Sequence, residues 1–362
     1  MQEKSSLMTN RQRIEALLNH QKPDRVPLWP FFDMTGFAAI YHNRPIQDAY
    51  KDPQLSLQMQ RKVCQDFGWI SSPFFPAFGV TDFGGERKLP TSEFSQAPST
   101  VRFPIETEED IDKLNIPDLD QASGITRENE FFKLCAQNRP VNQPFKALVL
   151  LTPNPYEWAG RLCRPDMLNR WVIRRPDLIN RILKIMGDII TDLLNHWYAN
   201  LGTDGVLIMS GGVICSNQII SPKHFERFVL PSLKEYHQKV LDKGFKHIYC
   251  HICGEHNLNL PYWQQVPMGE PGIISIGHEI NLEKAAQYFP GQIILGNMQP
   301  SIMQTGSPED VYKTASMIIQ QGKQLDNGYI FSMGCQFPPR AKLENVKAMN
   351  QAMDDFGWYK KG

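Results

Sequence analysis

Short apolar runs alternate with longer amphipathic stretches over the second half of the chain. The runs have strand length and are rich in β-branched residues, so they predict six strands, at residues 146–151, 206–209, 247–252, 273–276, 293–295 and 329–332. The stretches between them repeat apolar residues at helical spacing, which predicts helices over residues 177–200, 222–243, 282–288 and 308–321. Strands that alternate with helices in this way favour a parallel sheet.

The first part of the chain is less regular. Its pattern predicts a helix at residues 11–19, an extended apolar segment at 25–32, a helix at 55–66 and a second strand at 69–75. From residue 83 to 123 the composition turns to Gly, Pro, Ser, Thr and acidic residues, which is typical of loops with short helices.

Together these elements give eight strand and helix units, and this number favours a TIM barrel. We expect one domain over residues 1–362, with an N-terminal helical segment at about 1–25 and an excursion at about 83–140. A doubly wound sheet with a cap would give a similar local pattern. However, no G-x-G-x-x-G or Walker sequence follows any predicted strand, which disfavours nucleotide binding.

Charge and cysteine content narrow the class of partner. The chain carries 38 basic and 38 acidic residues, so no overall field attracts nucleic acid or an anionic membrane. The start of the chain lacks the apolar core of a secretory signal, and no apolar run approaches the roughly 18 residues of a membrane span. We therefore expect a cytoplasmic protein with seven reduced cysteines and a small-molecule or protein partner.

Two predicted strand ends carry metal-ligating side chains. His251 and Cys253 lie two residues apart at the end of one strand, and Cys335 follows the last strand. Residues two apart on a strand face the same side, and active groups of a TIM barrel lie at the carboxyl ends of its strands. One imidazole and two thiolates suit zinc, and three protein ligands leave the fourth tetrahedral position open, as in catalytic sites.

Other polar and sulfur-containing residues receive weaker assignments. Cys250 should face away from the site, and His247, Glu255 and His256 are reserve ligands only. We expect the four other cysteines, Cys64, Cys135, Cys163 and Cys215, to be buried and inert. Residues that follow strands are candidates for the rim of a pocket that binds cofactor and substrate: Asn154, Glu157, Ser210, His278 and Asn297. Several aromatic residues line such a pocket or, as is commoner, belong to the core: Phe74, Phe75, Phe78, Trp158, Trp263 and Phe337.

Motifs along nearly the whole chain resemble the uroporphyrinogen decarboxylase superfamily, and within it the zinc-dependent methylcobamide:coenzyme M methyltransferase branch. The matching segments are residues 22–27 (KPDRVP), the run from Ser221 to Pro231, 251–254 (HICG), 295–300 (LGNMQP), and Gly334-Cys335 before Glu344-Asn345. The resemblance implies a TIM barrel. It also implies that His251, Cys253 and Cys335 bind zinc.

The same resemblance separates this chain from the true decarboxylases. Those enzymes resemble one another in an early Arg-Gln-Ala-Gly-Arg segment that holds substrate carboxylates, whereas the corresponding stretch here reads Phe32-Asp33-Met34-Thr35-Gly36. They also carry His where this chain has Cys335. Decarboxylation of a porphyrinogen is therefore not expected.

The function that the resemblance implies is methyl transfer between a corrinoid cobalt and a small substrate activated by zinc. The substrate is a thiol such as coenzyme M, another thiol, a methylated donor or a folate. The corrinoid, methylcobalamin or its protein-bound form, is expected on a separate corrinoid protein, because the barrel accounts for the residues of this chain. Two alternatives stay open: a non-catalytic barrel that binds a tetrapyrrole or corrinoid, and a decarboxylase-like enzyme.

Overall fold

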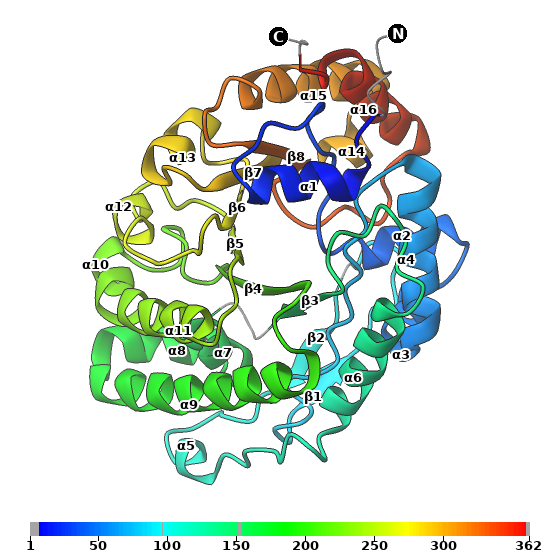
Figure 1. The fold of residues 1–362 in the computed structure, drawn as a ribbon. Helices are drawn as coiled ribbons and strands as arrows, with labels where there is room; N and C mark the ends of the chain where they lie inside the picture. Colours follow the sequence, from blue (N-terminus) through cyan, green and yellow to red (C-terminus); the bar gives the residue numbers. More distant parts are fainter. Residues whose placement is uncertain (1–6, 96, 151–153, 360–362) are drawn as a thin grey trace, which may run out of the picture.

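A parallel sheet forms the centre of the molecule (Figure 1). The computed structural model describes residues 7–95, 97–150 and 154–359, and within them six strands pair in the order β3-β4-β5-β6-β7-β8. The strands are β3 (Ala147–Leu150), β4 (Val206–Gly212), β5 (Ile248–Ile252), β6 (Ile273–Ile276), β7 (Ile293–Met298) and β8 (Tyr329–Met333). All six predicted strands are confirmed, although Leu151, the predicted end of the first, lies outside the described residues.

Two extended segments near the N-terminus take the remaining strand positions of the barrel. Leu28 forms a parallel bridge with Phe331 of β8, and the Ile70 N–H donates to the Leu28 carbonyl at 3.0 Å. Residues 25–32 and 69–75 contain Pro27, Pro30 and Pro73, which have no N–H to donate to a ladder. Residues 25–32 are thus extended, as predicted, whereas the strand predicted at 69–75 is an extended segment whose hydrogen bonding is too sparse for a regular strand.

A ring of helices surrounds the strands (Figure 1). The helices before β4 are α1 (Asn10–Leu18), α2 (Thr35–Tyr41), α3 (Asp48–Lys51), α4 (Pro53–Phe67), α5 (Asp110–Lys113), α6 (Ser123–Ala136), α7 (Pro155–Leu162), α8 (Pro165–Arg174) and α9 (Pro176–Leu201). Those after β4 are α10 (Pro222–His224), the π-helix η1 (Phe225–Val229), α11 (Leu230–Asp242), α12 (Leu260–Trp263), α13 (Leu282–Tyr288), α14 (Ile302–Thr305), α15 (Pro308–Gly322) and α16 (Leu343–Phe356). No helix of the described ranges is long and apolar enough to cross a membrane.

The helix predicted at residues 222–243 is interrupted. Its middle turn is the π-helix η1, in which the Leu230 N–H reaches back to the carbonyl of Phe225. Pro231 follows at once and lacks the N–H that a regular α-helix would use at this point, so the chain continues as the separate helix α11.

The excursion differs from the sequence prediction in one respect. It contains an antiparallel hairpin, β1 (Glu86–Lys88) with β2 (Ser99–Arg102), where the composition indicated loops and short helices. These strands are short and mostly exposed, so they lack the alternation of apolar and polar residues that identifies a strand.

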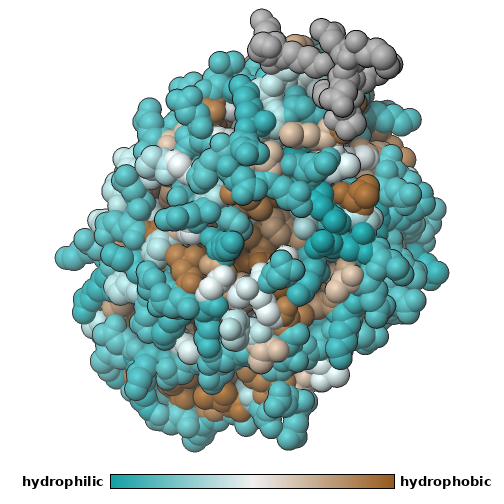
Figure 2. Space-filling view, in the orientation of Figure 1, coloured by the Kyte–Doolittle hydropathy of each residue, from teal (hydrophilic) through white to brown (hydrophobic). Residues whose placement is uncertain are grey.

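Apolar side chains fill the inside of the barrel. Trp29, Leu148 and Tyr249 belong to this inner core, and α1 contributes Ile14 and Leu17 to it. The face shown in Figure 2 is largely hydrophilic, with apolar residues gathered at its centre.

Candidate metal centre and substrate cavity

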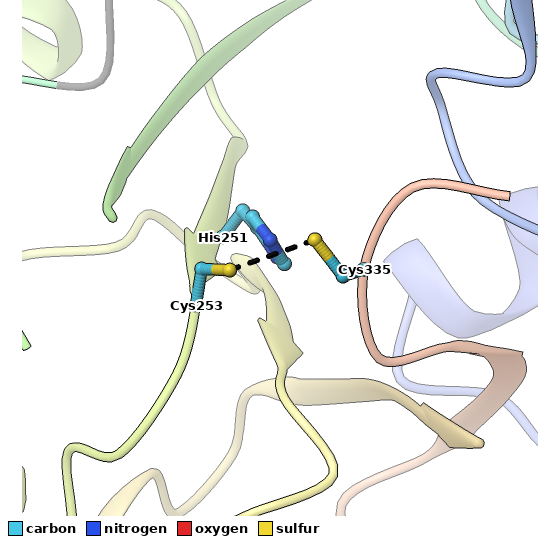
Figure 3. Close-up of side chains that lie close together, drawn as sticks. All are labelled: His251, Cys253 and Cys335. Carbon is cyan, nitrogen blue, oxygen red and sulfur yellow. Dashed lines mark hydrogen bonds between the residues drawn. The ribbon is translucent and has the colours of Figure 1, made fainter. Parts of the chain in front are cut away.

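The three predicted ligands lie together at the carboxyl ends of two strands. Nitrogen and sulfur atoms of His251, Cys253 and Cys335 lie within 4.8 Å of one another, and the two Sγ atoms are 3.6 Å apart. Figure 3 shows the two sulfurs on either side of the imidazole, with Cys335 reaching in from the loop after β8. Two ligands at the usual zinc–sulfur distance and a tetrahedral angle would be separated by about 3.8 Å. The donor set and its spacing therefore fit zinc.

The surrounding backbone fixes these side chains. The Cys253 N–H donates to the Gly212 carbonyl at 3.0 Å, which extends the pairing of β4 with β5 by one residue. A Cβ atom on Gly334, next to Cys335, would lie 2.8 Å from the backbone nitrogen of His278, so only glycine fits there. Glycine at this position allows the loop after β8 to approach the loop after β6.

A hydroxyl from the next strand orients the imidazole. His251 Nδ1 lies 2.9 Å from Oγ of Ser275 on β6, and the ring of Phe31 packs edge-on against the imidazole. With Nδ1 engaged, Nε2 is the ring nitrogen that would bind a metal. A hydrogen-bonded partner on the other ring nitrogen is the usual support of a histidine that binds a metal.

The two thiols influence each other's protonation. The hydrogen bond from Cys253, together with the nearby His251, lowers the pKa of Cys335 although burial opposes it. The same hydrogen bond and burial raise the pKa of Cys253, to which the carboxylate of Glu279 adds. Without a cation the pair thus favours a single negative charge, and a divalent metal would favour two thiolates.

A cavity of about 400 Å³ lies next to the cluster. All three predicted ligands line it, as does Asp33, whose carboxylate accepts hydrogen bonds from the Thr35 N–H and the Gln336 side chain. Its volume suits a small molecule. Other residues of its wall are Phe31, Phe32, Phe74, Phe78, Leu150, Met209, Ser210 and Gln336.

The predicted aromatic residues divide between this cavity and the core. Phe74 and Phe78 line the cavity. The other four belong to the buried hydrophobic core: Phe75, Trp158, Trp263 and Phe337.

Of the five predicted rim residues, Ser210 lines the cavity, and its Oγ lies 2.7 Å from Nε2 of the buried His237. Asn154 and Glu157 are buried, and they form hydrogen bonds with backbone groups instead of lining the cavity. Asn154 caps α7 and donates to the Gly211 carbonyl, whereas Glu157 accepts the N–H groups of residues 213 and 214. Burial raises the pKa of Glu157 despite these hydrogen bonds.

The two remaining rim residues lie away from the cavity lining. His278 is exposed, with Nδ1 3.4 Å from Oε2 of Glu279. Asn297 is buried and donates to the carbonyls of Gly277 and Ile280. Asn297 thereby fixes the loop after β6.

The reserve ligands have other partners. Nδ1 of His247 lies 2.7 Å from the Pro271 carbonyl, and Glu255 accepts the Asn257 N–H. His256 is buried, and its Nδ1 is engaged by Asn259 and Trp263. The five cysteines outside the cluster, Cys64, Cys135, Cys163, Cys215 and Cys250, are buried as predicted.

Two arginines of the cavity wall were not identified from the sequence. Arg87 comes from β1 and Arg161 from α7, and both line the cavity that His251, Cys253 and Cys335 also line. The segment at residues 32–36 lacks arginine, as noted above, but the cavity as a whole does not. Arg161 follows Glu157 by four residues, so the two side chains lie on the same side of α7. This spacing from a predicted rim residue is the one sequence feature that could have indicated Arg161. Nothing in the local pattern marks Arg87.

Comparison with known proteins identifies the family. The family model for uroporphyrinogen decarboxylase (URO-D) matches residues 9–356. The chain belongs to the uroporphyrinogen decarboxylase family. Members of this family are TIM barrels, which confirms the predicted fold.

Two curated relatives and one solved structure illustrate the range of the family. The uroporphyrinogen decarboxylase of Chlorobaculum tepidum is 23% identical over 351 residues, 92% of this chain and 94% of that protein. That of Anaeromyxobacter sp. is 29% identical over 86 residues, 24% of each chain. A methyltransferase from Methanosarcina mazei has the same fold, with a TM-score of 0.80, 21% identity and coverage of 96% of this chain and 99% of that chain.

Proposed function

We propose that this protein is a zinc-dependent, corrinoid-linked methyltransferase, which moves a methyl group between a corrinoid cobalt and a small substrate in the cavity. The observation that carries the proposal is the convergence of His251, Cys253 and Cys335 at the base of a small-molecule cavity. The motifs shared with the zinc-dependent branch of the family support the same function. The solved methyltransferase of the same fold adds further support.

The residues of the cluster suit a metal that activates a thiol. Zinc, when bound, supplies a Lewis acid that keeps a substrate thiol deprotonated near neutral pH. Cys253 and Cys335, as thiolates, would balance the charge of the ion, so that a substrate sulfur would keep its nucleophilicity. His251, oriented by Ser275, would complete a set of three protein ligands, so that a fourth ligand could come from the substrate.

The cavity wall supplies the surroundings for this chemistry. Phe31 and Phe32 stand next to His251, with ring centroids 4.9 and 6.2 Å from the imidazole. Both rings are buried, so they would shield a thiolate bound beside His251 from water. The open end of the cavity is where we place the methyl group of the corrinoid, carried by a separate corrinoid protein.

The substrate is a thiol such as coenzyme M when the cobalt donates the methyl group, or a methylated compound when the cobalt accepts it. The same three protein ligands would serve methyl transfer in either direction, because in both cases the substrate would bind the metal through a heteroatom. The test is incubation of the zinc-loaded protein with methylcobalamin and a panel of thiols, following the cobalt spectrum. We expect a spectral change that depends on zinc and is lost in His251→Ala and Cys253→Ala.

Decarboxylation of a porphyrinogen is the second candidate, because both curated relatives are uroporphyrinogen decarboxylases. Against it, residues 32–36 lack the arginines of the true decarboxylases, and a thiol stands at position 335. A parallel assay for carbon dioxide release from uroporphyrinogen separates the two candidates. Release at a rate above that of methyl transfer would overturn the proposal.

A non-catalytic barrel that only binds a tetrapyrrole or corrinoid is the third candidate. A fixed fourth protein ligand on the metal would favour it, whereas an exchangeable position favours catalysis. X-ray absorption spectra of the zinc-loaded protein with and without thiol distinguish the two. An additional sulfur ligand on thiol addition supports catalysis.

A further inference from the structure

The two sulfur atoms of the cluster are in direct contact. Sγ of Cys253 lies 3.6 Å from Sγ of Cys335, and no other atom fits between sulfur atoms at this distance (Figure 3). A disulfide bond joins its sulfurs at about 2.05 Å, and rotation of the two side chains about their Cα–Cβ bonds can supply the remaining approach. The pair therefore has the proximity that a disulfide requires.

Backbone hydrogen bonds hold the two cysteines next to each other. Cys253 continues the pairing of β4 with β5, and the chain on either side of Cys335 is also anchored. The Gly334 N–H donates to the last carbonyl of β7 at 2.7 Å, and the Phe337 N–H donates to the Asp33 carbonyl at 3.2 Å. None of these contacts involves a sulfur atom, so they keep the sulfurs adjacent in either redox state.

Small molecules can reach this pair but not the other cysteines. Cys253 and Cys335 are partly exposed, and both line the cavity of about 400 Å³. The other five cysteines are buried: Cys64, Cys135, Cys163, Cys215 and Cys250. Burial also raises the pKa of Cys64, Cys135 and Cys163 to about 12, which keeps them as uncharged, unreactive thiols. An oxidant in the cavity should therefore act on a single pair.

A disulfide and a metal ion would compete for the same two sulfur atoms. Zinc binds cysteine as the thiolate, and a sulfur in a disulfide carries no negative charge. Formation of the bond would leave His251 as the one remaining ligand of the three-residue cluster. A bound metal ion would in turn occupy both sulfurs and protect them from oxidation.

We propose that Cys253 and Cys335 form a reversible disulfide bond, so that the cluster holds either zinc or an oxidised cysteine pair, with a small organic disulfide in the cavity as the oxidant. A cavity that admits a small thiol also admits a slender disulfide made from two such thiols. The competition with zinc rests on the proposed function. The sulfur–sulfur bond itself rests only on the contact and on access through the cavity.

The reaction is a thiol–disulfide exchange in two steps. One cysteine thiolate attacks a sulfur of the small disulfide, which gives a mixed disulfide and releases the first small thiol. The second cysteine attacks the protein sulfur of that mixed disulfide, forms the bond between Cys253 and Cys335, and expels the second small thiol. The protein loses two electrons and two protons, and the small disulfide gains both. An excess of reducing thiol reverses the two steps.

The test uses the full-length protein and 2-hydroxyethyl disulfide, which is neutral and small. One portion is stripped of metal with a chelator, and a second portion is loaded with zinc. After reaction, free thiols are alkylated, and intact mass and non-reducing peptide maps report which sulfurs are joined. Cys253→Ser and Cys335→Ser each remove one partner. Cys250→Ala, on the same strand as His251 but buried, is the matched control.

We expect metal-free wild type and Cys250→Ala to lose two hydrogens without gaining a small thiol, and to yield one cross-linked peptide that contains Cys253 and Cys335. Each serine variant should instead retain one small thiol on its remaining cavity cysteine. The zinc-loaded protein should react at least about tenfold more slowly. Zinc affinity of the oxidised protein should fall at least about 100-fold and return after reduction with a phosphine.

Two results would overturn the disulfide: metal-free wild type that keeps all seven thiols, or one that carries a small thiol on each of the two cysteines without a cross-link. If a serine variant does not fold, the peptide map of wild type decides. Equal reaction rates with and without zinc would overturn the competition between metal and disulfide.

The same measurements separate this inference from the proposed function. A cross-link in a protein that binds no zinc in its reduced form supports the disulfide and contradicts the metal centre. One zinc ion per chain in a protein that forms no cross-link supports the metal centre and overturns the disulfide.

Discussion

The cavity has two chemically different walls. We call the candidate metal ligands His251, Cys253 and Cys335 the first wall, and Arg87 and Arg161 the arginine wall; all five residues line the cavity. The ligands stand at the ends of barrel strands, whereas the arginines come from helix α7 and from a hairpin in the excursion. The contrast suggests a division of labour, in which the barrel holds the reacting group and the elements around it select the substrate.

The two walls also differ in how many backbone and side-chain interactions fix their residues. His251 lies within the ladder of β5, and Ser275 bonds its side chain. Arg87 stands on a three-residue strand that pairs with one neighbour, with a register irregularity beside it. A change in the first wall should thus have a larger and more specific effect than a change in the second.

Removing a metal ligand should produce the largest effect. We expect Cys335→Ala to lose most of its zinc and to reduce methyl transfer by about a thousandfold or more, because the Lewis acid contributes several kcal/mol. Elemental analysis and the methylcobalamin assay measure the two effects. The barrel should stay folded, since its apolar core does not depend on a metal.

Cys250→Ala is the matched control for this prediction. Cys250 belongs to the same strand as His251 but is fully buried in the apolar core, with a pKa raised by burial. The substitution should cost about 1 kcal/mol of stability and leave the zinc content at one ion per chain. Equal zinc in wild type and Cys335→Ala, or unfolding of the metal-free protein, would refute the ligand assignment.

Removing the Ser275 hydroxyl that orients His251 should have the next largest effect, a loss of zinc affinity. Ser275→Ala removes the partner of Nδ1 at 2.9 Å, which frees the imidazole to rotate. We expect zinc affinity to fall by about 10- to 100-fold with the fold intact. Competition with a chromophoric chelator measures the affinity, and an unchanged value would show that the imidazole needs no such support.

The sequence was most informative where local periodicity and chemistry coincide. The strands from β3 to β8 contain continuous apolar runs, because both faces of a parallel barrel strand are buried, so their existence and order followed from the pattern. The ends of β4 and β7 did not, since both strands continue for three residues beyond the predicted end, where glycine and polar residues interrupt the apolar run. His251 and Cys253 lie two residues apart at the end of one such strand, so the pattern placed both side chains on the same face. Cys335 was linked to them by its place after the last strand and by the family resemblance.

The other residues of the cavity and its supporting loops could not be predicted, because their positions depend on contacts between segments that are distant in the sequence. Arg87 and Arg161 are 74 positions apart, and no spacing rule connects a hairpin in an excursion with a helix after β3. Asn154 and Asn297 follow strands, as a cavity residue would, yet they bond backbone carbonyls of neighbouring loops. The same residue types serve both purposes, so the pattern alone does not separate a loop support from a cavity residue.

A smaller effect concerns Glu128, a buried residue of α6. Burial raises the pKa of Glu128 to about 8, partly offset by the N–H groups of residues 77 and 78. The folded protein therefore keeps a proton that the unfolded chain releases above a pH of about 4.5, and stability should fall as pH rises from about 5 to 8.

Glu128→Gln tests this dependence, because the amide oxygen can accept the same two N–H groups without carrying a charge. We expect the variant to lose less stability than wild type between pH 6 and pH 8, with a difference on the order of 1 kcal/mol. Urea unfolding at the two pH values measures it. Parallel pH profiles for the two proteins would show that Glu128 is not protonated in the folded state.

The smallest effect should come from exchanging one cation for another in the arginine wall. Arg161→Lys keeps the positive charge but replaces the planar fork of N–H groups with a single ammonium. Two thiols of equal length, one with an anionic end and one neutral, report the effect. We expect the preference for the anionic thiol to fall by about threefold in Arg161→Lys and by about tenfold in Arg161→Met, because lysine keeps the charge but not the fork. Calorimetry with the two thiols measures both values. If the lysine variant bound the anionic thiol as poorly as the methionine variant, the geometry of the N–H groups would decide anion binding. If it equalled wild type, positive charge alone would account for the preference.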